Sequence, residues 1–289
     1  MEKIWINGAV TPLKDAKISV EDRGFQFADG VYEVIRIYRG MPFTLDHHLR
    51  RLEKSCEGIR LRDAFDRAAL TVEISRFVER SGLTDGMVYL QVTRGAAPRN
   101  HIFPARVQPT ILFYARALPP VAPPGHGEGV KLHSVPDERW KRCWIKAIAL
   151  LPNVLAKNEA VELGADEAVF VENGIVSECS ASNLFAVIGG TIFTHPVGPK
   201  VLPGITRLLL TEIAAEIGID LIERPLLETE AVAAGELFIT STTRELNWVQ
   251  SWDRKPVGNK CGPVTRRLHE AYAERVSMAT SPHIPVGAR

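Results

Sequence analysis

One lysine lies alone in an apolar segment. Lys146 is the only charged residue in the stretch from Cys143 to Leu151. Burial lowers the pKa of a lysine, and a neutral amine can attack a carbonyl group to form a Schiff base. The alternative is a lysine at the edge of an apolar strand, with its ammonium group in water. The segment therefore indicates either a covalent nucleophile or a surface lysine.

A second group of residues could bind a phosphate. A Pro-Gly turn precedes a predicted helix and leaves the amides of Ile205 and Thr206 free at its N-terminus, where free amides and the helix dipole attract anions. The hydroxyl-rich run 240–243 follows a predicted strand, and its members Ser241 and Thr242 could donate to the same anion. An ordinary helix cap and an ordinary turn remain the alternatives.

Two further positions carry suitable polar chemistry. Glu178 ends a predicted hairpin strand and precedes small residues that would let a planar ring approach, so its carboxylate could keep a pyridine nitrogen protonated. Arg99 and His101 lie in a loop bounded by prolines, and a planar guanidinium there could hold a carboxylate with two hydrogen bonds. Glutamates at strand ends and polar loop residues are also common on ordinary surfaces.

The composition excludes several classes of protein. The net charge of +1, from 35 basic and 34 acidic residues, gives no electrostatic reason to expect nucleic acid or an anionic membrane as a partner. The sequence has neither a signal-peptide pattern nor a long apolar span, which predicts a cytoplasmic protein. Its four cysteines are far apart and its histidines show no metal-binding spacing, so we expect no metal site.

The elements that position these residues mix strands and helices without a regular βαβ rhythm, which favours an α+β fold. Asp46 is predicted to cap a helix with apolar residues at helical spacing behind it, and the Asn173-Gly174 pair predicts a hairpin. Strands are expected over 3–7, 31–38, 87–93, 110–117, 130–134, 167–172, 175–178 and 237–240, with another near 221, and helices over 68–81, 151–163 and 206–217.

The distribution of prolines and glycines predicts two domains. Residues 118–129 contain four prolines and three glycines, which break both periodicities and indicate a linker. The prediction is therefore a small domain over 1–117, the linker over 118–129, a larger domain over 130–276, and a loose tail over 277–289 that lacks periodicity.

Taken together, these residues resemble a known enzyme group. The segments 22–33 and 202–207, with Lys146 and Glu178 between them, are similar in order and spacing to the class IV, fold-type IV pyridoxal-phosphate enzymes. Within that group, the segment 93–101 resembles the D-amino-acid aminotransferases. The resemblance implies a small N-terminal α/β sandwich, a larger C-terminal mixed α/β barrel-like domain, and a homodimer with a shared active site.

The resemblance also implies a role for each residue. Lys146 would form the Schiff base with pyridoxal 5′-phosphate and move the substrate proton, and Glu178 would pair with the pyridine nitrogen. The cofactor phosphate and ring would be held by Arg51, Leu202, Ile205, Thr206, Ser241 and Thr242. Substrate carboxylate binding would fall to Tyr32, Arg99 and His101, of which the last two would reach in from the partner subunit.

The implied reaction is a two-step exchange in which a D-amino acid such as D-alanine becomes a 2-oxo acid and a second oxo acid, such as 2-oxoglutarate, accepts the nitrogen. Cys179 and Ala181 stand where relatives commonly carry glycine and serine, and Trp144 is bulky, so the pocket could differ in shape. A branched-chain L-amino-acid aminotransferase or an aminodeoxychorismate lyase of the same fold is the enzymatic alternative, and a non-catalytic cofactor-binding protein is another.

Overall fold

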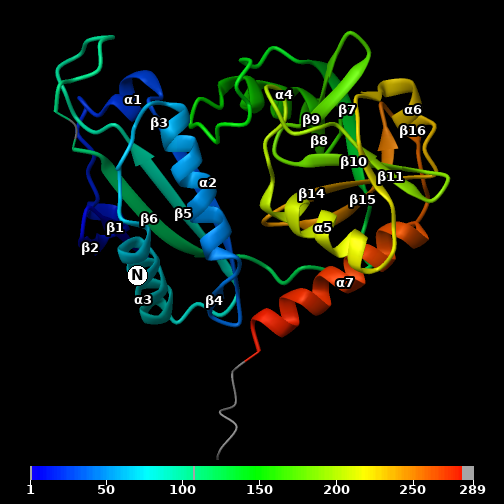
Figure 1. Cartoon of the computed structure of the whole chain (residues 1–289), viewed down its shortest axis with the longest axis horizontal. Helices are drawn as coiled ribbons and strands as arrows, with labels where there is room; N and C mark the ends of the chain where they lie inside the picture. The colour runs from blue at the N-terminus through cyan, green and yellow to red at the C-terminus, as the bar shows by residue number, and fades with distance from the viewer. Residues whose placement is uncertain (1, 107, 282–289) are drawn as a thin grey trace, which may run out of the picture.

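The fold consists of two sheet-based halves. The structure is a computed structural model that describes residues 2–106 and 108–281. A six-stranded sheet forms the core of the N-terminal half and a ten-stranded sheet that of the C-terminal half, and the two halves lie side by side (Figure 1). This arrangement confirms the predicted two-part α+β architecture. No helix in the described part of the chain is long and apolar enough to cross a membrane.

The N-terminal sheet is antiparallel, with strand order β2-β1-β6-β5-β3-β4. Along β3, Val31 and Ile35 are fully buried, whereas the alternating Tyr32 and Val34 are half-buried, so one face of the sheet forms the core. Helices α2 and α3 cover that face. The elements are β1 (Lys3–Ile6), β2 (Ala9–Pro12), α1 (Arg23–Phe27), β3 (Gly30–Tyr38), β4 (Met41–Pro42), α2 (Leu45–Gly58), α3 (Arg67–Ser81), β5 (Gly86–Thr93) and β6 (Thr110–Ala117).

The C-terminal sheet has the strand order β12-β11-β10-β14-β15-β7-β8-β9-β13, with β16 paired to β15. The predicted hairpin at Asn173-Gly174 is confirmed as the turn between β8 and β9. The elements are β7 (Val130–Pro136), α4 (Leu151–Glu162), β8 (Glu167–Glu172), β9 (Ile175–Cys179), β10 (Asn183–Ile188), β11 (Thr191–Thr194), α5 (Ile205–Glu216), β12 (Leu221–Glu223), β13 (Leu226–Leu227), α6 (Glu228–Val232), β14 (Glu236–Ser241), β15 (Glu245–Trp252), β16 (Lys255–Pro256) and α7 (Pro263–Ala279).

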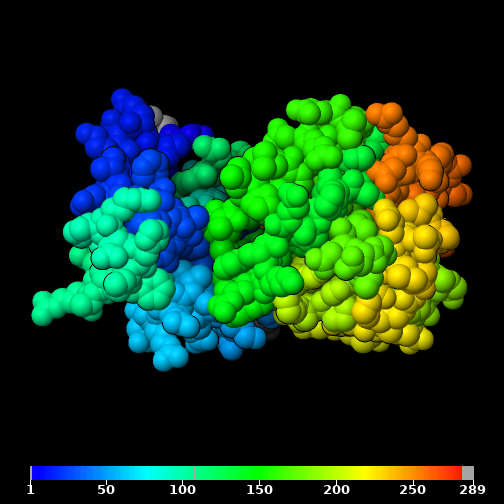
Figure 2. Space-filling view, turned by 90° about the horizontal axis from the view of Figure 1, so that it is seen from above, coloured from blue at the N-terminus to red at the C-terminus, as the bar shows by residue number. Residues whose placement is uncertain are grey.

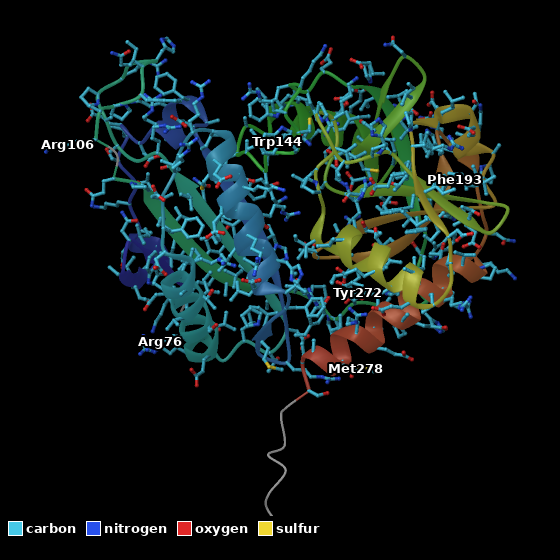
Figure 3. All side chains as sticks on the ribbon, in the orientation of Figure 1. Arg76, Arg106, Trp144, Phe193, Tyr272 and Met278 are labelled. Carbon is cyan, nitrogen blue, oxygen red and sulfur yellow. The ribbon has the colours of Figure 1, made fainter. Side chains whose placement is uncertain are left out.

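Direct contacts hold the two halves together. The hydroxyl of Tyr38 at the end of β3 donates to Oε1 of Glu245 at 2.6 Å, and the ring of Phe43 packs edge-on against Tyr272 of α7 (Figure 3). Seen from above, the green segment of the C-terminal half lies against the blue and cyan N-terminal half (Figure 2). Residues 118–129 contain no helix or strand, and the domain division placed there stays a prediction.

Two sequence predictions about helix ends were wrong. Helix α2 is capped by Thr44 and not by Asp46, which lies in the first turn and pairs with Arg50. The loose tail was expected from residue 277, but α7 continues to Ala279 because buried residues recur every four positions, at Leu268, Tyr272 and Val276. Residues 282–289 of that tail lie outside the described residues.

Helix α4 differs from the amphipathic helix expected over 151–163. Its buried residues are the small Ala156 and Ala160, whereas Leu151 and Leu155 are 68% and 62% exposed. The large apolar side chains of α4 therefore lie on the surface of this chain.

Candidate functional site

A pocket of about 450 Å³ collects most of the predicted site residues. Its wall includes residues of β3 and α2 from the N-terminal half and residues of β9, α5 and β14 from the C-terminal half. The predicted residues that line it are Tyr32, Arg51, Lys146, Glu178, Leu202, Ile205, Thr206, Ser241 and Thr242. Residues from distant parts of the sequence thus face one cavity, although their roles there stay predictions.

Lys146 is fixed by its backbone. Its carbonyl accepts a hydrogen bond from the amide of Tyr32 at 2.9 Å, and its own amide donates to Oγ of Ser55 at 3.2 Å. The neighbouring Ile145 and Ala147 are buried in the N-terminal core, which explains the apolar segment. The Lys146 side chain is half-buried in the pocket wall, and its Nζ lies 4.2 Å from the centre of the Tyr32 ring. The surface-lysine alternative is therefore excluded.

The N-terminus of α5 points its free amides at the pocket. Gly204 is the N-cap, and no side chain caps this helix. A Cβ at residue 204 would lie 2.1 Å from Oδ1 of Asn183, so only glycine permits this close approach. The hydroxyl of the buried Thr240 nearby has no hydrogen-bond partner among the described residues. Uncapped amides beside hydroxyl groups fit a phosphate.

Arg51 lies beside this helix end and is held by a buried acid. Its Nε and Nη2 each donate to Glu33 at 2.7 Å, and its Nη1 donates to the carbonyl of Pro203 at 2.8 Å. His48 contacts the same carboxylate through Nδ1 at 2.7 Å. Three of the five N–H groups of Arg51 are thus engaged, which leaves two for an anion in the pocket.

Glu33 carries its negative charge without any exposed surface. Burial alone would raise the pKa of Glu33, but the charges and hydrogen bonds of Arg51 and His48 outweigh it and lower the pKa from 4.5 to about 2. An acid whose pKa is depressed by folding stabilises the fold above its unfolded pKa, and this contribution disappears as the pH falls towards the folded value.

We therefore expect the stabilisation from Glu33 to be complete above about pH 4.5 and to be lost between pH 4.5 and about pH 2. The measurement is the free energy of unfolding of the wild type and of Glu33→Gln as a function of pH. The wild-type advantage should be large at pH 7 and shrink across that interval. An advantage that is independent of pH would contradict the assignment.

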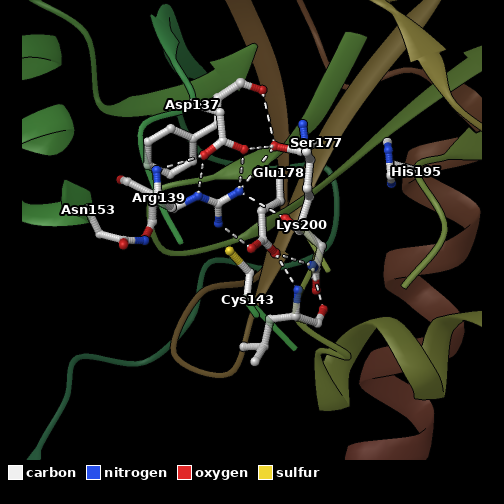
Figure 4. Close-up of polar contacts among 12 residues, drawn as sticks. Asp137, Arg139, Cys143, Asn153, Ser177, Glu178, His195 and Lys200 are labelled. Atoms are coloured by element: carbon white, nitrogen blue, oxygen red, sulfur yellow. Dashed lines mark hydrogen bonds and ion pairs between the residues drawn. The ribbon is translucent and has the colours of Figure 1, made fainter. Parts of the chain in front are cut away.

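Glu178 is the centre of a buried polar cluster (Figure 4). Its Oε1 accepts from Nη1 of Arg139 at 2.6 Å, and its Oε2 accepts from Nδ2 of Asn183 and from the amide of Leu202, both at 3.0 Å. Burial raises the pKa of Glu178, and the charge and hydrogen bonds of Arg139 counteract the rise. Three of the four lone-pair positions of the carboxylate are used, and one remains for a donor in the pocket.

Sequence reasoning missed Arg139. Its guanidinium is buried, binds Asp137 as well as Glu178, and lies 4.0 Å from the centre of the Phe170 ring. The only local signal was the alternating Asp-x-Arg pair directly after a predicted strand. Because the third member of the cluster is 39 residues further along the chain, that signal did not identify it as part of a site.

Arg99 and His101 do not reach this pocket. Both are exposed, and both pack on the ring of Phe27, with the Arg99 guanidinium carbon 4.4 Å and the His101 ring centre 5.4 Å from its centre. Their blue-green loop projects from the side of the N-terminal half that faces away from the C-terminal half (Figure 2). Any contact of these residues with such a pocket therefore requires a second copy of the chain.

The residues present fit pyridoxal 5′-phosphate. Lys146 offers an amine for the aldehyde, Glu178 an acceptor for a ring N–H, and the end of α5 with Arg51 a site for the phosphate. The described residues contain no group of histidine, cysteine or acidic side chains that could hold a metal ion.

Comparisons with known proteins agree with this fit. Residues 30–252 match the family described as amino-transferase class IV. The chain is 38% identical to the D-alanine aminotransferase of Bacillus licheniformis, over 96% of this chain and 99% of that protein. The structure of the Escherichia coli branched-chain amino acid aminotransferase superposes with a TM-score of 0.89 at 27% identity, covering 98% of this chain and 97% of the other. The T.th. branched-chain enzyme, solved with pyridoxamine 5′-phosphate, gives a TM-score of 0.87 at 29% identity, covering 97% and 95%.

Proposed function

The chain belongs to the amino-transferase class IV family, and from this premise we propose that it exchanges the amino group between D-amino acids and 2-oxo acids, with pyridoxal 5′-phosphate as cofactor. The observation that carries the proposal is the pocket that brings Lys146, Glu178 and the free end of α5 together. Among the family's activities, D-alanine transamination is favoured because identity to the Bacillus licheniformis enzyme is 38%, against 27% to the Escherichia coli branched-chain enzyme.

Each residue then has a chemical task. Bound pyridoxal 5′-phosphate supplies an electron sink for the negative charge that develops at the substrate α-carbon. Lys146 would hold the aldehyde carbon covalently and, once released, carry the proton to and from the α-carbon through its Nζ. Glu178 would accept the ring N–H, and Arg51 with the amides of Ile205 and Thr206 would bind the phosphate.

We also propose that the chain works as a homodimer in the cytoplasm. A partner copy would supply Arg99 and His101, which lie outside the pocket of their own chain. The large apolar residues exposed on α4, including Leu151 and Leu155, are of the kind that subunit interfaces cover. Four buried free cysteines suit a reducing compartment.

The requirement for a second substrate tests the reaction type. With D-alanine and 2-oxoglutarate together, we expect continued formation of pyruvate, whereas D-alanine alone should yield about one pyruvate per active site. An aminodeoxychorismate lyase would release its product without any added oxo acid. Continued turnover in the absence of an oxo acid would therefore contradict transamination.

Arg99→Ala is expected to weaken the binding of D-alanine by about ten- to a hundredfold, because one charge-assisted contact to the substrate carboxylate is lost. The measurement is the KM for D-alanine at saturating 2-oxoglutarate. Arg106→Ala, in the same exposed loop, is the matched control and should leave the KM unchanged. An unchanged KM in Arg99→Ala would remove Arg99 from the site.

A further inference from the structure

A carboxylate outside the pocket completes the cluster around Glu178. Asp137 follows β7, and its side chain is 4% exposed. Both of its oxygens accept hydrogen bonds from Arg139, Oδ1 from Nε and Oδ2 from Nη2, each at 2.9 Å. The hydroxyl of Ser177 donates to Oδ2 at 3.0 Å (Figure 4). Arg139 lines the pocket and Asp137 does not.

The geometry divides Arg139 between the two acids. Asp137 occupies the edge of the guanidinium formed by Nε and Nη2, where a carboxylate binds most strongly. Nη2 also donates to the carbonyl of Lys200 at 2.9 Å and to Oγ of Ser177 at 3.1 Å. Only Nη1 is left for Glu178, which therefore receives a single contact from Arg139.

The charges of the cluster do not cancel. Burial raises the pKa of Asp137, but the hydrogen bonds and charge of Arg139 outweigh this effect and lower the pKa below its usual value, so Asp137 stays ionised at neutral pH. An arginine is always charged. With Glu178 ionised as well, two negative charges oppose one positive charge, and one negative charge remains.

The other titratable groups beside the cluster do not supply the missing positive charge from within it. Burial raises the pKa of the Cys143 thiol to about 11, so the thiol is neutral. The ammonium group of Lys200 pairs with Glu172. Lys146 lies in the pocket wall, where the amine would be consumed by the covalent link to the cofactor.

We propose that Asp137 sets the charge that Glu178 presents to the ring nitrogen of the cofactor, by occupying Arg139. The inference rests on the proposed function, in which Glu178 accepts the ring N–H. With Asp137 ionised, the remaining negative charge favours a proton on the ring nitrogen. With Asp137 neutral, Arg139 would pair fully with Glu178 and this attraction would be lost. Asp137 is thus a positioning residue, which acts through Arg139.

The ring nitrogen can be observed directly. We would load the holoenzyme with ¹⁵N-labelled pyridoxal 5′-phosphate and follow the ring-nitrogen resonance by NMR across a pH series. In Asp137→Asn we expect the affinity of this nitrogen for its proton to fall about tenfold or more. Asp137→Glu keeps the charge and should keep the wild-type resonance. Ser177→Ala removes hydrogen bonds but no charge, and should also keep it.

A charge-compensating pair separates this role from a structural one. Asp137→Asn brings the net charge of the cluster to zero, and adding Arg139→Gln restores one negative charge. The double variant is therefore expected to recover a protonated ring nitrogen. If Asp137 only supported the fold, the double variant would be no better than Asp137→Asn. An unchanged resonance in Asp137→Asn, or no recovery in the double variant, would overturn the inference.

Arg139→Gln alone gives a second decision if Asp137→Asn does not fold. Its cluster carries two negative charges, so the ring nitrogen should hold its proton more tightly than in the wild type, and a weaker hold would overturn the inference. Failure of the wild type to bind pyridoxal 5′-phosphate would remove the proposed function together with this inference. A protonated wild-type nitrogen with unresponsive variants would remove the inference alone.

Discussion

Replacing Lys146 by alanine is expected to lower amino-group transfer by at least about a thousandfold and to leave no cofactor fixed to the chain after borohydride treatment. The wall of the described pocket contains no second lysine that could take over the amine. A positioned proton carrier alone contributes about 10²- to 10⁴-fold, and the covalent link to the cofactor is lost at the same time. Activity assays and the mass of the borohydride-treated protein are the two measurements.

Lys141→Ala is the matched control, because Lys141 is exposed, precedes Lys146 in the same segment, and does not line the pocket. This variant should retain both the transfer activity and the mass of the fixed cofactor. Transfer at the wild-type level in Lys146→Ala would show that the assigned mechanism is wrong.

Replacing Arg51 by methionine is expected to destabilise the fold by about 3–5 kcal/mol and to release the cofactor. The loss leaves Glu33, which is fully buried, with His48 as its only remaining charged contact among the described residues. It also removes the guanidinium beside the N-terminus of α5, which is tied there through Pro203. The measurements are the free energy of unfolding and the dissociation constant for pyridoxal 5′-phosphate.

A double variant separates the two effects of Arg51. Arg51→Met combined with Glu33→Met removes the buried charge together with its partner, and such replacements are often neutral for stability. We expect the double variant to recover most of the lost stability while its cofactor affinity remains low. Recovery of both properties would mean that Arg51 serves the fold and does not bind the phosphate.

Local sequence signals were sufficient for much of the fold and for most of the predicted pocket residues. Asn173-Gly174 marks a hairpin because its conformation is tied to its composition, and Gly204 marks a helix start through a turn that larger residues cannot form. Lys146 stood out because one charge in an apolar segment is costly unless it has a function. The resemblance then linked these separate signals to one site.

The remaining features depend on contacts between distant segments. Arg139 joins Asp137 to Glu178, and no periodicity in the sequence specifies that pairing. The bidentate hold of Glu33 on Arg51 is equally nonlocal, since the two residues lie on a strand and a helix of different periodicity. The boundary errors at Asp46 and residue 277 arose because helix ends are set by packing as well as by capping residues.

The most direct test of D-amino-acid transamination is the visible spectrum of the purified holoenzyme, recorded before and after addition of D-alanine, L-alanine or L-leucine in parallel. We predict that D-alanine alone removes the yellow absorbance, because its amino group passes to the cofactor, and that pyruvate appears in equal amount. Loss of the yellow absorbance with L-leucine but not with D-alanine would contradict the account and assign the chain to the branched-chain enzymes.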